Sequence, residues 1–273
     1  MELKDILYTK VAGIAYITLN RPESFNAFSV DMLKGWASAL LDAGADDEVN
    51  VIVVTGAGKA FCSGGDVKAM QAGKGFLHRE DETGQLGPMD YKKSLWDLIH
   101  RIPLILENLD KPVIASINGP ATGAGLDMAL MCDLRIASDQ AKFAESYIRM
   151  ALVPGDGGAF LLPRLVGLPK ALELLWTGDI IDAEEALRIG LVNRVVPAGQ
   201  LEQATVEMAR RLAQGPQLAI RMIKRLVYQG LKSDLRTALD TVSSHMAIIT
   251  GTEDHKEAAK AFFEKRKPCF KGR

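Results

Sequence analysis

The sequence predicts an α/β fold built on a largely parallel β-sheet. Strand, loop and helix patterns alternate through the first two thirds of the chain, whereas helical patterns fill the last third. The apolar runs Val51–Val54 and Val113–Ile117 are continuous, which is typical of strands buried on both faces. Two architectures remain open at this point, a doubly wound sheet and a coiled spiral of ββα units.

The first elements follow from turn and capping signals. Ile6–Val11 and Ile14–Leu19 are short β-rich runs separated by an alanine and a glycine, so they are expected to form a hairpin. A turn with a proline ends the second strand, and Ser29 is placed to cap the helix that follows. The apolar residues of this helix recur on one face: Met32, Leu33, Trp36 and Leu40.

The middle and end of the chain are predicted from composition and periodicity. Residues 70–90 are rich in glycine, glutamine and charge and are expected to form a mobile surface loop. Tyr91–Leu109 has a helical pattern, with a break expected at Pro103. We divide the chain into a core, residues 1–195, and a helical region, residues 196–273. The other predicted elements are a helix from about Thr122–Gly125 to Met131, a strand over Asp133–Ala137, and helices from about Leu168 onward.

The composition argues against several classes of protein. The formal net charge is -1, so the basic excess typical of nucleic-acid binding is absent. The three cysteines are widely spaced and form no CxxC pair, which argues against disulfides and zinc and favours a cytoplasmic location. No apolar run approaches the ~18–20 residues that span a membrane. The first ten residues lack the pattern of a signal peptide.

Two glycine-containing loops follow the predicted strands. Gly64 and Gly65 come after the Val51–Val54 strand, where paired glycines let a ligand approach the backbone. An exposed N–H there can stabilise a developing oxyanion, although an ordinary tight turn is the commoner reason for such a pair. Residues 118–127 join a strand end to a helix start, where free N–H groups favour negative charge. This second loop is not a dinucleotide loop, because Met128 replaces the third glycine of GxGxxG.

Asp127 and Asp156 are the candidate acid and base groups. Asp127 lies in the first turns of the predicted helix, where interaction with the helix dipole is the alternative role. Asp156 lies among glycines and a proline, where a turn or N-cap role is the alternative. The pair can exchange protons with a substrate if the fold brings both carboxylates together. None of the four histidines neighbours a GxSxG motif, which argues against a Ser-His-Asp hydrolase.

In order and at these spacings, the motifs resemble the crotonase (enoyl-CoA hydratase/isomerase) superfamily nearly from end to end. The resemblance implies a spiral of ββα units, followed by C-terminal helices that pack in trimers, often paired into hexamers. It also implies an acyl-CoA substrate, with CoA present as part of the substrate and with no cofactor, metal or redox group. The segments that carry the resemblance are residues 17–22, 26–27, 61–68, 112–127, 132–133, 154–158, 253–254 and 262–267.

The resemblance assigns roles to individual positions. The N–H groups of Gly65 and Ala124 fall where the family forms its oxyanion hole for the thioester carbonyl. Removing one such donor typically costs on the order of 3–4 kcal/mol of barrier. Lys68, Ala27 and Lys265 match positions that contact CoA, with Lys265 supplied by the C-terminal tail of the same or a neighbouring subunit.

This sequence departs from the two glutamates with which hydratases of the family activate water. The first position is Asp127, as in isomerases of the superfamily. The second position is Tyr147, which is a poor base at neutral pH because the ordinary pKa of tyrosine is ~10. Glu145 lies two residues away, in a different register that is expected to aim it elsewhere. Asp156 stands in a loop that resembles one in C–C bond hydrolases of β-diketones.

We therefore expect an enoyl-CoA hydratase/isomerase-type enzyme in which Asp127 and Asp156 exchange protons while Tyr147 orients the substrate. One alternative is a C–C bond hydrolase of a 1,3-dicarbonyl, in which Asp156 activates water. Another is a catalytically silent binding member, for which the net charge argues against RNA. The expected partners are the acyl-CoA and further copies of this chain, in a homotrimer or hexamer, with neither nucleic acid nor membrane.

Overall fold

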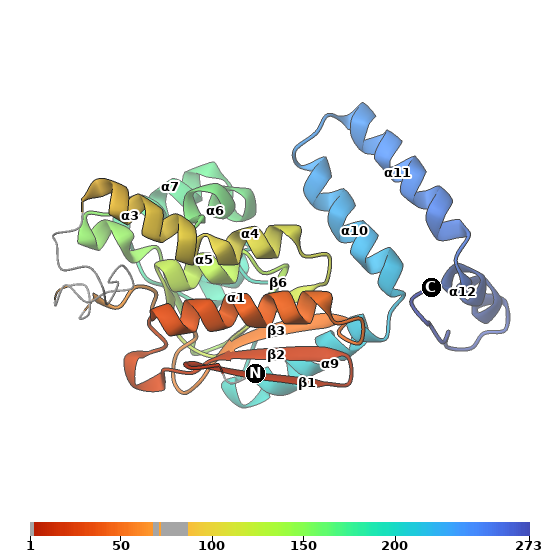
Figure 1. The fold of residues 1–273 in the computed structure, drawn as a ribbon, viewed down its shortest axis with the longest axis horizontal. Helices are drawn as coiled ribbons and strands as arrows, with labels where there is room; N and C mark the ends of the chain where they lie inside the picture. Colours follow the sequence, from red (N-terminus) through yellow and green to blue (C-terminus); the bar gives the residue numbers. More distant parts are fainter. Residues whose placement is uncertain (1–2, 68–70, 72–86) are drawn as a thin grey trace.

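The computed structural model describes residues 3–67, 71 and 87–273. Its main sheet has six strands in the order β1-β2-β3-β4-β6-β9. The first three of these lie side by side in Figure 1. The first two strands form the predicted antiparallel hairpin, and every later pair of neighbours is parallel. The strands are β1 (Ile6–Val11), β2 (Ile14–Leu19), β3 (Val51–Gly56), β4 (Val113–Ile117), β6 (Leu134–Ser138) and β9 (Arg194–Val196).

A second, smaller sheet runs alongside the main one. Its strands are β5 (Ala121–Thr122), β7 (Lys142–Ala144) and β8 (Ile181–Asp182), in that order. Cys62 joins this sheet through a parallel bridge to Ala121. The chain therefore passes from β3 to the bridge, from β4 to β5 and from β6 to β7, each time from the main sheet to the second. This arrangement is a spiral of ββα units, and the predicted fold class is confirmed.

Both faces of the main sheet are buried at β3 and β4, which explains the continuous apolar runs. Ile52 and Val54 of β3 pack into the large core that contains the apolar face of α1 (Val30–Ala45). Val51 and Val53 pack on the opposite face, against α9 (Leu201–Ala213). Burial of one such side chain stabilises the fold by about 1.5–3 kcal/mol, so the sheet is held from both sides.

Helix α1 begins and packs as predicted. The Ser29 hydroxyl accepts a hydrogen bond from the Met32 N–H at 3.0 Å, which satisfies one of the unpaired N–H groups of the first turn. Trp36 and Leu40 are fully buried against the sheet. The cap and the apolar face together fix where this helix starts and how it lies.

The helical segment after residue 87 starts and breaks earlier than predicted. It comprises α3 (Pro88–Ser94), the π-helical turn η2 (Leu95–Ile99) and α4 (Arg101–Asn108). The break lies at His100, whose N–H bonds the Leu95 carbonyl five residues back at 2.9 Å. Pro103 lies in the first turn of α4, where main-chain N–H groups have no partner within the helix. Its missing N–H therefore costs no hydrogen bond. The expected mobile loop, residues 70–90, lies largely outside the described residues.

The last third is interrupted by strands that the helical pattern did not predict. β8 and β9 have only two and three residues, too few for a periodic signal. The division of the chain at residue 195 stays a prediction. No helix in the described part of the chain is long and apolar enough to cross a bilayer. The remaining elements are η1 (Pro22–Ser24), α5 (Ala124–Leu130), η3 (Ser146–Met150), α6 (Gly158–Val166), α7 (Leu168–Thr177), α8 (Ala183–Arg188) and η4 (Ala198–Gln200).

The chain ends in a C-terminal arm, residues 217–273, that extends away from the core (Figure 1). The arm contains α10 (Gln217–Gly230), α11 (Leu235–Thr250) and α12 (Glu253–Phe263). Lys224 of α10 ties it to the core by donating to the Lys111 carbonyl at 2.9 Å and to Asp133 at 2.8 Å. Its exposed large apolar side chains include Ile223, Val227, Leu231, Leu235, Leu239, Met246, Phe262 and Phe263.

Candidate active site

The two glycine loops contact each other at the carboxyl ends of β3 and β4. Gly64 has a φ of +82°, and a Cβ at this position would lie 2.8 Å from the Thr122 carbonyl oxygen and 2.9 Å from the Ala124 nitrogen. The Thr122 N–H donates to the Cys62 carbonyl at 3.0 Å and holds the loops together. The close approach therefore depends on the missing side chain of residue 64. Gly65 follows directly in the sequence.

Two main-chain donors are available where these loops meet. Ala124 is the first residue of α5, so its N–H has no acceptor within the helix. Among the described residues, none accepts a hydrogen bond from the Gly65 N–H. Such N–H groups, held by the fold, can stabilise an anionic oxygen without reorganising.

Asp127, Tyr147 and Asp156 meet in one buried cluster beside these donors. The Tyr147 hydroxyl lies 2.8 Å from Oδ2 of Asp127 and 2.7 Å from Oδ2 of Asp156. Asp127 comes from α5, Tyr147 from η3, and Asp156 from the loop that precedes α6. The side chains of the two aspartates are buried, with 0% and 4% exposure. The fold thus brings together two carboxylates that lie far apart in the sequence.

The cluster holds its carboxyl groups at unusually high pKa values. Burial, followed by the negative charge of Asp156, raises the pKa of Asp127 to about 7. Burial also raises the pKa of Asp156, while the Tyr147 hydroxyl and the charge of His100 oppose the rise. The pKa of the Tyr147 phenol is raised by burial and by both carboxylates, so the phenol stays protonated. Asp127 is consequently poised to gain or lose a proton near neutral pH.

Glu145 belongs to the same cluster, contrary to the expectation that its register aims it elsewhere. The expectation is wrong because β7 ends at Ala144 and a tight turn begins at Ser146, so the chain bends and directs residue 145 inward. The Glu145 side chain is 1% exposed and faces Asp127 across Gly158. Its only sequence signal was an acidic residue next to the apolar pair Phe143-Ala144.

His100 fixes the loop that carries Asp156. Its Nε2 lies 2.7 Å from the Gly155 carbonyl oxygen, so this nitrogen carries the hydrogen and donates it. The Trp96 ring packs on the imidazole edge to face, with ring centroids 5.6 Å apart. The π-helical turn at residues 95–99 sets the position of both rings. No local pattern around His100 indicates this role.

With this geometry in place, comparison with known proteins decides the family. The sequence model described as Enoyl-CoA hydratase/isomerase matches residues 9–273 of the chain. The chain belongs to the enoyl-CoA hydratase/isomerase family. It is an enzyme of that family, and the relatives found include both hydratases and isomerases.

The relatives match over essentially their whole length. The chain is 37% identical over 268 residues to the short-chain-enoyl-CoA hydratase of Clostridium acetobutylicum, covering 98% of this chain and 97% of that protein. It is 33% identical to the trans-2-decenoyl-[acyl-carrier-protein] isomerase of Streptococcus mutans, covering 100% of both. A solved structure titled putative enoyl-CoA hydratase from Streptomyces coelicolor A3(2) superimposes with a TM-score of 0.91 at 34% identity, covering 100% of this chain and 96% of that one.

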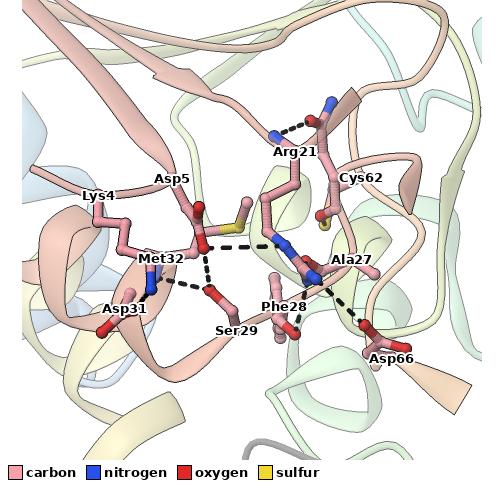
Figure 2. A network of polar contacts seen from close by, with 11 residues as sticks. Lys4, Asp5, Arg21, Ala27, Phe28, Ser29, Asp31, Met32, Cys62 and Asp66 are labelled. Carbon is pink, nitrogen blue, oxygen red and sulfur yellow. Dashed lines mark hydrogen bonds and ion pairs between the residues drawn. The ribbon is translucent and has the colours of Figure 1, made fainter. Parts of the chain in front are cut away.

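In this member of the family, Arg21 connects the Ala27 segment to the first glycine loop (Figure 2). Its Nη1 donates to the Ala27 carbonyl at 2.6 Å, and its Nη2 lies 3.4 Å from Oδ2 of Asp66. Asp66 directly follows Gly65. The Phe28 N–H adds a second connection by donating to the Gly64 carbonyl at 2.7 Å. The guanidinium therefore links the expected CoA-binding position Ala27 to the main-chain donor of Gly65.

Of the two lysines predicted to bind CoA, the structure describes only Lys265. Lys68 lies outside the described residues. Lys265 follows α12, where its N–H bonds the Phe262 carbonyl at 3.3 Å. The α12 end of the arm lies far from α5, which carries Ala124 and Asp127 (Figure 1). Within one chain, Lys265 is therefore not part of the cluster around Asp127.

Proposed function

We propose that this enzyme moves a carbon–carbon double bond along the acyl chain of an acyl-CoA thioester. The observation that carries the proposal is the Tyr147 hydroxyl, which lies between Asp127 and Asp156 at hydrogen-bonding distance from both. A double-bond shift removes a proton from one carbon and adds a proton at another. It therefore needs a base and an acid that can exchange roles.

Proton counting supports an acid and a base in this cluster. A phenol has one hydrogen to donate, so it donates to only one of its two aspartate neighbours. The other short contact needs a second proton, which that aspartate carries and donates to the phenol oxygen. The raised pKa values of both aspartates favour this state. One carboxyl is then an acid and the other a base, joined by Tyr147.

In the proposed reaction, the thioester oxygen is bound by the N–H groups of Gly65 and Ala124. The ionised aspartate takes a proton from Cα, and the electron pair of that C–H bond moves into a dienolate whose negative charge rests on the thioester oxygen. The protonated aspartate gives its proton to Cγ, and the double bond shifts toward the thioester. Tyr147 passes a proton between the two aspartates to restore the resting state. CoA enters only as part of the substrate, because proton transfer needs no electron acceptor.

Water addition is the competing reaction, and the residue at position 147 argues against it. Hydratases of the family use a second glutamate where Tyr147 stands. A buried phenol with a raised pKa does not act as a base at neutral pH. The C–C hydrolase and silent-binder alternatives have no observation in their favour, since the relatives are named as hydratases and isomerases.

Two substrates test this proposal directly. We expect a 3-enoyl-CoA to yield a 2-enoyl-CoA of unchanged mass, and a deuterium placed at Cα to appear in part at Cγ. We expect Asp127→Asn and Asp156→Asn each to lose roughly 100-fold or more in kcat, while Asp179→Asn, at an exposed surface position, keeps full activity. Conversion of a 2-enoyl-CoA to a product heavier by one water, with no turnover of the 3-enoyl-CoA, would overturn the proposal.

We also propose that the chain forms a homotrimer or a pair of trimers through its C-terminal arm. The arm exposes a row of large apolar side chains, among them Leu235 at 75% and Phe263 at 84% exposure. Exposed apolar surface of this extent is typical of protein–protein contact. Light scattering should give a mass of three or six chains, and Leu235→Asp with Leu239→Asp should shift the mass toward the monomer. Trimers could bring Lys265 of one chain to the CoA of its neighbour.

A cytoplasmic location completes the proposal. Cys62, Cys132 and Cys269 are free thiols, and the first two are buried. Free thiols are typical of proteins kept in a reducing compartment.

A further inference from the structure

Among the described residues, no N–H or O–H group donates an assigned hydrogen bond to the Glu145 carboxyl group. Both of its carboxyl oxygens are buried and unpartnered among the described residues, and so is Oδ1 of Asp127. A buried polar atom without a hydrogen-bond partner destabilises the folded state. Each such atom therefore needs an explanation, such as a missing proton or ligand. The proposed reaction uses Asp127, Tyr147 and Asp156 and leaves Glu145 without a role.

The unpartnered atoms of Glu145 and Asp127 face each other. A Cβ on Gly158 would overlap Oδ1 of Asp127 and lie 3.1 Å from Oε1 of Glu145. The first residue of α6 therefore leaves just enough room for the two carboxyl groups to approach. Two carboxylates accept hydrogen bonds and donate none, so this contact is stable only when one of them carries a proton.

We propose that Glu145 is a positioning residue, which stays protonated and donates a hydrogen bond to Oδ1 of Asp127, while Tyr147 holds Oδ2. The inference rests on the proposed function for its catalytic consequence, but not for the protonation itself. Asp127 would then be fixed at both oxygens, with its charged form favoured by Glu145 and Tyr147 in addition to the Gly158 main chain. This arrangement sets the basicity of the group that takes the substrate proton.

The electrostatics of the cluster also indicate that Glu145, and not Asp127, keeps the proton. Burial, and then the negative charge of Asp127, raises the pKa of Glu145 to about 10, well above the value of about 7 for Asp127. The groups that face this pair are Tyr147 from η3 and Asp156 from the loop before α6. His100, which follows the π-helical turn, acts on Asp156 and so only indirectly on Asp127. None of these groups supplies Glu145 with a cation.

Two substitutions at this position separate the possible roles of Glu145. Glu145→Gln keeps a donor for Asp127 and removes the titratable proton, so we expect kcat within about threefold of the parent and an unchanged acidic limb of the kcat/KM profile. Glu145→Leu keeps the bulk and removes the donor. Because the lost hydrogen bond favoured ionised Asp127, we expect kcat to fall roughly tenfold or more and the acidic limb to move up by roughly one pH unit.

Infrared spectroscopy tests the protonation without turnover. At mildly alkaline pH the difference spectrum between the parent enzyme and Glu145→Gln should contain a carbonyl band of a protonated carboxylic acid, and the difference spectrum between the parent and Asp179→Asn should contain none. Absence of that band, or loss of most activity in Glu145→Gln, would overturn the proposal because Glu145 would then be ionised. An unchanged pH limb in a folded Glu145→Leu would reduce Glu145 to a structural role and also overturn it. If no enoyl-CoA is turned over, the proposed function fails while the infrared result still decides the protonation.

Discussion

Substitution of Gly64 by alanine should separate the two loops that carry the main-chain donors. The added Cβ would meet the Thr122 carbonyl oxygen at 2.8 Å and the Ala124 nitrogen at 2.9 Å. Ordinary contact begins at 3.4 Å, so the loops must part by 3.4 minus 2.8, or 0.6 Å. Catalytic groups tolerate displacements of about 0.5 Å. Loss of one oxyanion donor lowers kcat by about 10²–10³-fold, or about 2.7–4 kcal/mol, and we expect a loss in this range.

Gly190→Ala is the matched control for this experiment. Gly190 has a φ of +79°, close to that of Gly64, but its nearest neighbour to an added Cβ is a carbonyl oxygen at an ordinary 3.7 Å. Both variants should lose about 1–2 kcal/mol of stability from the left-handed backbone. Only Gly64→Ala should lose kcat and weaken binding of acetoacetyl-CoA, whose enolate imitates the charged intermediate. Equal kcat values in two folded variants would refute the reasoning that the loop contact builds an oxyanion hole.

Three further predictions concern pH, the arginine link and the first helix cap. Because folding raises the pKa of Asp127 from 3.8 to about 7, its contribution to stability is present below pH 3.8 and is lost as the pH rises toward 7. Thermal melts of Asp127→Asn should show a weaker loss of stability with rising pH than melts of the parent. The kcat/KM of the parent should fall about tenfold per pH unit below about pH 7, because the base becomes protonated. Equal dependence of stability on pH in the parent and the variant would contradict the assignment. Arg21→Lys keeps the charge but loses the planar fork that bonds Ala27 and reaches Asp66, so KM for the acyl-CoA should rise about tenfold, which steady-state kinetics would detect. Ser29→Ala should cost about 1 kcal/mol in denaturant unfolding with kcat unchanged, and a loss of activity at full stability would show that the cap does more than start α1.

Local signals predicted most of the fold because each of them acts over a few residues. Continuous apolar runs indicated β3 and β4, since residues that alternate between two buried faces must all be apolar. Ser29 indicated the start of α1 through a hydrogen bond within one turn. The short strands β8 and β9 were missed because pairing with distant strands, and not local periodicity, makes them strands. Resemblance to the superfamily was needed to choose the ββα spiral over a doubly wound sheet.

The site was predicted unevenly for a similar reason. Gly65, Ala124 and Asp127 lie in segments that resemble the superfamily, so the resemblance pointed to them. Glu145 and His100 have ordinary local surroundings, and their roles come from contacts across the fold, with Asp127 and with the Gly155 carbonyl. No spacing rule along one chain predicts that a turn after β7 directs a glutamate toward α5.

The charge that the cluster can hold at position 156 depends on the residue at position 147. A glutamate at position 147 would place a fourth carboxyl in a cluster that already buries Asp127, Glu145 and Asp156. Two like charges about 4 Å apart repel by about 4 kcal/mol at the effective dielectric of a protein site, so each added carboxylate forces another proton onto the cluster. A phenol in that place adds no charge and supplies one shared hydrogen, which lets a carboxylate stand at position 156 and remain able to ionise. The residues at positions 147 and 156 are therefore electrostatically coupled. In the proposed reaction, this arrangement lets Tyr147 pass a proton between Asp127 and Asp156.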